Sequence, residues 1–171
     1  ALLPLLRDAG ALHCQAVVAD LQQVDVAIPR ILQSATALGP VEILVNNSGG
    51  PAGGALVEAD AAAFLQGFHR HVIASQRLVQ GCLVGMTQAG YGRIINVIST
   101  SVREPLVGLG VSNTIRGAMA GWSKTLAREL PPGVTINNVL PGLTDTERLD
   151  ELRLAKAHKS GLSPKQVNER W

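Results

Sequence analysis

Among the side chains of this sequence that could move a proton or polarise a bond are His71, Ser99, Ser112 and Arg116. Ser112 and Arg116 are four residues apart, so on a helix they lie on the same side. Arginine can bind a ribose or a phosphate, but its pKa above ~12 prevents it from shuttling protons. The hydroxyl of serine is a far weaker acid than the phenol of tyrosine, so it donates a proton less readily. Imidazole, with an ordinary pKa of ~6.5, could donate a proton near neutral pH. A packed or surface histidine is the simpler interpretation of His71.

The elements that must position these side chains follow from the hydrophobic pattern. Apolar runs rich in β-branched residues alternate with longer amphipathic stretches, which predicts βαβ units and a parallel sheet. The apolar runs do not alternate with polar residues, as is typical of a sheet covered on both faces. We expect strands near 12–18, 42–46, 93–98 and 134–139, and helices near 2–9, 24–38, 60–88, 111–129 and 147–157.

Ligands of such a sheet bind beyond the carboxyl ends of its strands. The segments that follow the expected strands are Asp20-Leu21, Asn47 to Gly50, Ser99 to Ser101 and Pro141 to Thr146. Each has a structural alternative, since an aspartate at a strand end can cap a helix, and a serine or a Pro-Gly pair can simply form a turn. Tyr91, the only tyrosine, precedes a strand and therefore belongs to the opposite end of the sheet.

Composition and charge exclude several classes of protein. The 171 residues are 46% hydrophobic and 16% charged, with a net charge of +2, which excludes a disordered chain and predicts one globular domain over 1–171. Arginine and lysine are scattered, so no nucleic-acid partner is expected. The apolar runs are far shorter than the ~20 residues that cross a bilayer, and the start has no basic signal-peptide region, so we expect a soluble, cytoplasmic protein. Neither cysteines nor histidines have metal-ligand spacing.

Four segments, in order and with the expected spacing, resemble motifs of the short-chain dehydrogenase/reductase family. They are Ala19-Asp20-Leu21, Val45 to Gly50, Ile94 to Ser99 and Asn138 to Thr146, and the helix 112–130 is similar as well. The resemblance extends to about residue 148 and is greatest to 3-oxoacyl-(acyl-carrier-protein) reductases, enzymes of fatty acid biosynthesis. It implies a Rossmann-like, doubly wound parallel sheet in a three-layer αβα arrangement.

The resemblance also implies NADP or NAD as the cofactor. Asp20 and Leu21 would contact the adenine, and the segment Asn47-Ser48-Gly49 would shape the adenosine-ribose side of the pocket. Arg116 would hold the nicotinamide ribose. The backbone at Pro141 and Gly142 would hold the nicotinamide carboxamide, and the hydroxyls of Thr144 and Thr146 would reach the carboxamide or the pyrophosphate.

The catalytic positions depart from the family pattern. Ser99 matches the serine that binds the substrate oxygen, but the family tyrosine, lysine and helical asparagine correspond to Ser112, Arg116 and His71. In the family, the lysine lowers the tyrosine pKa from ~10 so that the phenol can protonate the alkoxide. The resemblance implies an oxidoreductase acting on a carbonyl or secondary alcohol, with water, Ser112 or His71 relaying the proton. The alternative is a catalytically silent member that binds a nucleotide or a protein.

The family's opening βαβ portion, with its glycine-rich phosphate loop and the strand that selects between NAD and NADP, does not precede Ala1. The last strand and the substrate-covering helix do not follow. We therefore expect that this sequence covers only part of the molecule, with its ends disordered or omitted, and a truncated product without cofactor is the alternative. The family further implies a small-molecule or acyl-thioester substrate, and a homodimer or homotetramer formed through helices 60–88 and 111–129, where Gly117, Ala118, Ala120 and Gly121 permit close approach.

Overall fold

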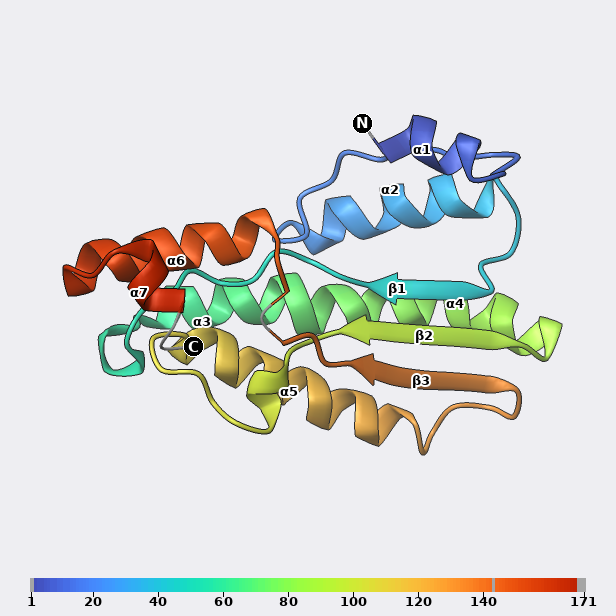
Figure 1. Ribbon diagram of the computed structural model, residues 1–171. Coiled ribbons are helices and arrows are strands. Elements are labelled where there is room, and N and C mark those ends of the chain that lie inside the picture. Colours follow the sequence, from blue (N-terminus) through green and yellow to red (C-terminus); the bar gives the residue numbers. More distant parts are fainter. Residues whose placement is uncertain (1, 143, 169–171) are drawn as a thin grey trace.

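Three parallel strands form one sheet in the computed structural model, which describes residues 2–142 and 144–168 (Figure 1). The strands β1 (Ile43–Asn46), β2 (Gly92–Val97) and β3 (Val134–Val139) are hydrogen-bonded in the order β1-β2-β3. The segments between them are helical, so each pair of strands is joined by a crossover, as parallel pairing requires. This arrangement confirms the α/β, Rossmann-like fold class.

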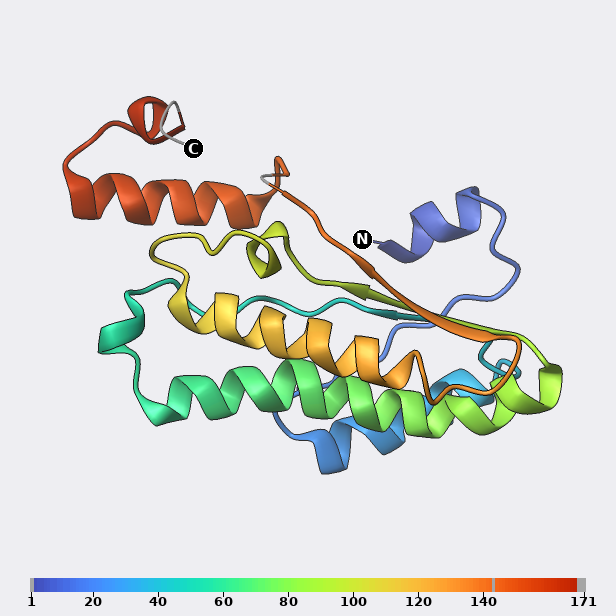
Figure 2. The same cartoon turned by 90° about the horizontal axis from the view of Figure 1, so that it is seen from below.

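Helices account for most of the remaining chain. The helices α4 (Ala74–Ala89) and α5 (Gly110–Leu126) pack on one side of the sheet, and α2 (Val24–Thr36) packs against α4 (Figure 2). Three further helices are α1 (Leu2–Asp8), α6 (Glu147–Ser160) and α7 (Pro164–Asn168), and short 3-10 turns occupy Leu56–Glu58 and Thr100–Val102. Over the described residues, none of these helices is both long and apolar enough to span a membrane.

The long helix expected at 60–88 is interrupted. It begins as α3 (Ala61–Phe68), where the Asp60 side chain accepts a hydrogen bond of 2.7 Å from the Ala63 amide, and continues through a π-helical turn, His69–Ile73, into α4. A π turn shifts the helical register by one residue and is frequent at functional sites. His71 lies in the middle of this turn, so the direction of its side chain depends on a local irregularity of the helix. The spacing of the hydrophobic residues in the sequence does not reveal that irregularity.

The strand expected at 12–18 does not form. This segment is extended chain whose backbone has no ladder partner among the described residues, and Leu12 and Val18 are 92% and 85% exposed. Apolar β-branched residues favour an extended backbone, but a strand also needs a neighbour to accept its hydrogen bonds. The prediction of a strand here was wrong, and the described sheet ends at β1.

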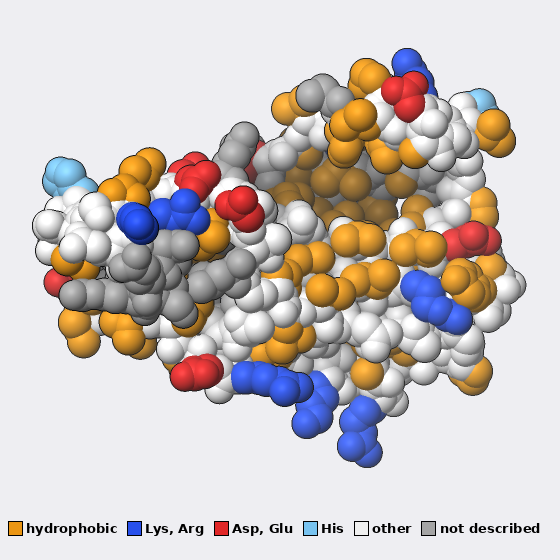
Figure 3. All heavy atoms as spheres, viewed as in Figure 1, with side chains coloured by type: hydrophobic (Ala, Val, Ile, Leu, Met, Phe, Trp, Pro, Cys, Tyr) orange, Lys and Arg blue, Asp and Glu red, His pale blue; other side chains and the backbone are white. Residues whose placement is uncertain are grey.

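The two faces of the sheet differ in how far helices cover them. On the helix side, Ile94 and Ile136 pack with Val79 and Met86 of α4 to form the main core. On the other face Ile43 and Val45 remain 55% and 54% exposed, and Figure 3 shows hydrophobic side chains gathered over the strands there. The uniformly apolar strands predicted that helices would cover both faces of the sheet, whereas the described helices cover one face.

Candidate functional site

The segments that follow β1, β2 and β3 meet at the carboxyl edge of the sheet. The Ile98 amide donates to the Val139 carbonyl at 2.9 Å, and the Thr100 amide donates to the Pro141 carbonyl at 3.0 Å. Ser99 and the Pro141-Gly142 segment are therefore neighbours, as the parallel register predicted. Tyr91 is at the opposite end, where the Arg93 guanidinium stacks on its ring at 4.2 Å from the centroid, so this phenol cannot serve the site.

A backbone bridge ties the glycine-rich loop after β1 to the start of α5. The Gly54 amide donates to the Gly108 carbonyl at 2.7 Å, and the Gly110 amide donates to the Gly54 carbonyl at 3.2 Å. A side chain at Gly110 would collide with the Leu56 backbone, since its Cβ would lie 2.8 Å from the Leu56 nitrogen. This close contact fixes the position of the helix that carries Ser112 and Arg116.

An asparagine ladder crosses the strands just inside this edge. Asn46, Asn96 and Asn138 are in register on adjacent strands. The Asn46 amide donates to Asn96 Oδ1 at 2.9 Å, and the Asn96 amide donates to Asn138 Oδ1 at 3.0 Å. This ladder was not predicted from the sequence, although an asparagine near the end of each of three apolar strands was a usable signal. The ladder locks the strand ends and leaves Asn46 Oδ1 buried without a partner.

His71 is the most perturbed titratable group at the site. Its side chain is 3% exposed, and Nδ1 lies 2.8 Å from Ser48 Oγ, whereas Nε2 is buried and unpaired. Burial, reinforced by the charges of Arg116 and Arg70, lowers the pKa of His71 to about 4, against a smaller opposing effect of a hydrogen bond with the Gly49 backbone. The ring is therefore neutral at pH 7, so the ordinary pKa assumed from the sequence does not apply.

Arg116 lies one helical turn beyond Ser112 with its guanidinium directed at the carboxyl edge. Its Nη1 donates to the Val97 carbonyl at 3.0 Å, and a Cβ at Gly50 would be 3.7 Å from its Nη2. That distance is an ordinary van der Waals contact, so the guanidinium lies between the Gly50 loop after β1 and the end of β2. Arg116 is buried, and burial lowers its pKa.

The two serines have different surroundings. Ser99 Oγ accepts a 3.1 Å hydrogen bond from the Ser101 amide and caps the turn Thr100–Val102, the structural role weighed for it. That bond uses a lone pair and leaves the Ser99 hydroxyl proton available for a ligand. Ser112 is half-buried in the first turn of α5, and α5 packs against the turn that Ser99 caps. The Ser112 hydroxyl forms no hydrogen bond with the residues that the structure describes.

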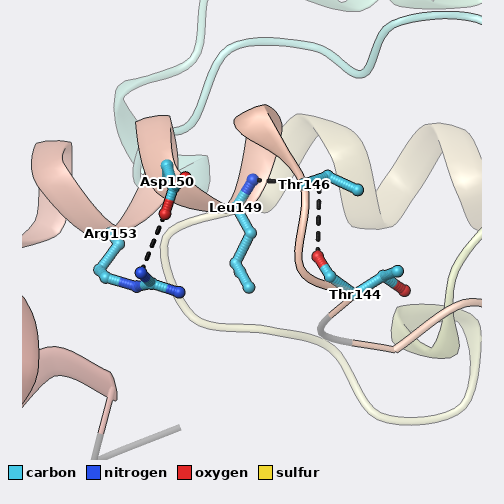
Figure 4. Close-up of polar contacts among 5 residues, drawn as sticks. All are labelled: Thr144, Thr146, Leu149, Asp150 and Arg153. Carbon is cyan, nitrogen blue, oxygen red and sulfur yellow. Dashed lines mark hydrogen bonds and ion pairs between the residues drawn. The ribbon is translucent and has the colours of Figure 1, made fainter.

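The expected cofactor residues are present at the edge but several are engaged locally. Asp20 is exposed, and its carboxylate accepts from the Gln22 amide at 2.9 Å, which forms a turn and not the helix cap weighed against adenine binding, because Gln23 is the N-cap of α2. Thr146 Oγ1 donates to the Thr144 carbonyl at 3.3 Å and accepts from the Leu149 amide at 3.4 Å, so Thr146 caps α6 (Figure 4). The Thr144 amide donates to the Gly142 carbonyl at 2.9 Å. Leu143, within the same motif, lies outside the described residues.

Two cavities adjoin the edge and share Arg70 and His71. One, of about 110 Å³, lies between Leu21, the segment from Asn46 to Ser48, Val97 and Arg116. It brings together side chains that the sequence predicted to meet, including Leu21, Asn47 and Ser48. The other, of about 260 Å³, lies between Pro51, Gln66 and Val111. His71 and Arg70 thus separate a space near the strand ends from a space beside the glycine-rich loop.

Comparison with known proteins places these features in context. A sequence profile described as short chain dehydrogenase matches residues 4–157. A candidate ketoacyl reductase of Streptomyces coelicolor is 33% identical over 156 residues, which are 86% of this chain and 58% of that protein. L-xylo-3-hexulose reductase of Hypocrea jecorina is 31% identical over 157 residues, 80% of this chain and 51% of that protein. The chain thus spans between half and three fifths of these relatives.

Solved structures of reductases also resemble this chain. A variant of actinorhodin polyketide ketoreductase, crystallised with NADPH, is 28% identical, with a TM-score of 0.87 over 98% of this chain and 65% of that chain. L-sorbose reductase from Gluconobacter frateurii, complexed with NADPH and L-sorbose, is 26% identical, with a TM-score of 0.83 over 94% of this chain and 62% of that chain. Both structures therefore share the fold of this chain over nearly all of its length.

Proposed function

This chain belongs to the short-chain dehydrogenase family, and we propose that it acts as an NADP- or NAD-dependent oxidoreductase similar to 3-oxoacyl-(acyl-carrier-protein) reductases. Its substrate would be a small carbonyl compound or secondary alcohol, or an acyl thioester, converted in the cytoplasm. The observation that carries this proposal is the meeting of Asn47 to Gly50, Ser99 and Pro141-Gly142 at one edge of the sheet. Similarity to NADPH-bound reductases supports it.

The loops at this edge are compatible with part of a dinucleotide. Cβ atoms at Gly49 and Gly142 would have no neighbour within 4 Å, so ligand atoms could approach both backbones closely. The buried, unpaired atoms Asn46 Oδ1 and His71 Nε2 are polar groups that a ligand or water could satisfy. When bound, the nicotinamide would supply or accept the hydride. Leu21, Asn47, Ser48 and Thr144 would hold other parts of the same molecule.

The protein's own residues would orient the substrate and deliver a proton. Ser99 would donate its hydroxyl proton in a hydrogen bond to the substrate oxygen, and Arg116 would bind the ribose with donors not used by the Val97 carbonyl. Arg116 would hold charge without moving a proton. The proton would come from water or through Ser112, and neutral His71, hydrogen-bonded to Ser48, would act as a relay and not as a charged acid.

Cofactor binding and turnover test this function separately. We expect NADPH or NADH to bind the full-length protein with a change in nicotinamide fluorescence, and an acetoacetyl thioester to be reduced with loss of absorbance at the nicotinamide band. Failure to bind either nucleotide would contradict the proposal. The second candidate, a silent member that binds a nucleotide or a protein, is favoured by the joint loss of the family tyrosine, lysine and asparagine at Ser112, Arg116 and His71. It predicts binding without turnover.

We also propose a homodimer or homotetramer formed through α4 and α5, and its disruption is a prediction. Gly117 and Gly121 lie on the exposed side of α5, and a Cβ at either would have no neighbour within 4 Å, so the helix can approach another closely. Introducing Gly117→Glu and Gly121→Glu together should yield monomer in light scattering at micromolar concentration, because buried like charges repel. The control Val26→Glu, at an exposed site on α2, should remain oligomeric. A monomeric unmodified protein would refute the proposal.

A further inference from the structure

The 110 Å³ cavity at the carboxyl edge has an unusual charge distribution. Arg70 and Arg116 both line it, and none of the described residues that line it is an aspartate or a glutamate. Among the described residues, neither arginine forms a salt bridge. The charges of both arginines oppose protonation of His71, which places the two guanidinium groups within electrostatic reach of one imidazole. Two cations without a carboxylate partner, one of them buried, leave a positive potential in a partly enclosed space.

We propose that this cavity is an oxyanion site, in which Arg70 and Arg116 bind a phosphate or carboxylate group. Guanidinium groups are well suited to both, because their planar N–H donors match the oxygen geometry. The Arg116 guanidinium uses one donor on the Val97 carbonyl, its only hydrogen bond to the described residues, so its other donors are available. This inference rests on the proposed function, which assigns Arg116 and the neighbouring Leu21, Asn47 and Ser48 to the cofactor, and it deepens that function by naming the charged group that Arg70 and Arg116 bind together.

Polar groups beside the arginines support such a site. His71 Nε2 is buried without a partner among the described residues, the residue is 3% exposed, and it lines the cavity. When Nδ1 accepts from the Ser48 hydroxyl, Nε2 carries the proton and can donate to an anion. Asn46 Oδ1 is also buried without a described partner, but as an acceptor it would take a bridging water and not the anion itself. A buried polar atom without a partner costs free energy, which a ligand with bound water could recover. The Ser48 hydroxyl, 2.8 Å from the other imidazole nitrogen, holds the ring in place. The asparagine ladder holds Asn46 in the same way.

Direct titration with inorganic phosphate and with acetate, at constant ionic strength, tests the site without any enzymatic reaction. Phosphate, acetate or both should bind the full-length protein measurably by calorimetry and raise its melting temperature. Arg70→Met should weaken the binding by about tenfold or more, because it removes a charged hydrogen-bond donor. Arg70→Lys should retain most of it. The matched control is Arg77→Met, since Arg77 pairs with Asp25 at 3.3 Å and does not line the cavity.

The phosphate titration and the acetate titration together identify the source of the anion. If phosphate binds and NADPH displaces it, with NADPH affinity also reduced in Arg70→Met, the site takes a cofactor phosphate. If acetate binds in the presence of NADPH and Arg70→Met leaves NADPH affinity unchanged, the site takes a substrate carboxylate. Either result supports the oxyanion site. It would be overturned if both anions bound Arg70→Met as tightly as the unmodified protein, or if Arg77→Met lost as much binding. These readouts remain interpretable if the protein has no reductase activity.

Discussion

Replacing Ser112 with tyrosine and Arg116 with lysine is expected to raise carbonyl-reductase turnover by about 10²–10⁴-fold, the usual contribution of general acid catalysis. The scaffold around these positions retains Ser99 and the Pro141-Gly142 segment at the carboxyl edge, whereas the proton donor is altered. A lysine one turn beyond the new phenol would lower its pKa toward neutrality. Reduction of an acetoacetyl thioester, followed by nicotinamide absorbance at saturating cofactor, measures the gain.

The matched control is Ser112→Phe with Arg116→Lys, which adds the same ring without the hydroxyl and should show no gain. Cofactor affinity must be measured for all three proteins, because Arg116 also donates to the Val97 carbonyl. Unchanged or lower turnover in the tyrosine variant, with cofactor binding intact, would argue against a merely absent proton donor. If His71→Asn then abolished native activity, a different native chemistry would be indicated, and otherwise a role in binding alone.

The free energy of unfolding is expected to fall by about 3 kcal/mol between pH 7 and pH 4 through His71 alone. The pKa of His71 is about 4 in the folded protein, against an ordinary value of 6.5. As the pH falls through 6.5, the unfolded chain takes up a proton at this histidine and the folded protein does not. The contribution is therefore fully present above pH 6.5, decreases as the pH falls, and levels off below pH 4.

Urea unfolding of the unmodified protein and of His71→Asn at pH 7 and pH 4.5 isolates this contribution from that of the carboxylates. The asparagine does not titrate, so its variant should lose less stability on acidification. His158→Asn is the control, because His158 is exposed on α6, and it should follow the unmodified protein. An equal loss of stability in His71→Asn and the unmodified protein would show that the buried imidazole does not carry the effect.

The sequence by itself determined the class of fold and the edge at which the site lies. Apolar runs at 42–46, 93–98 and 134–139 correspond to β1, β2 and β3 within a residue, because a buried parallel strand requires a continuous apolar segment. The direction of parallel strands then placed Ser99 beside Pro141 and Gly142, and Tyr91 at the far end. These inferences needed only the order of the elements along the chain.

The chemical state of the site was decided by tertiary structure alone. Burial and the approach of Arg116, 45 residues away in the sequence, lower the pKa of His71 and keep its ring neutral, with a further contribution from the adjacent Arg70 within the π turn His69–Ile73. The segment 12–18 has strand-like composition but no partner for its backbone, so it remains extended chain. A pKa and a strand both depend on what surrounds a residue in space, because charges, desolvation and ladder hydrogen bonds come from neighbours that local sequence does not specify.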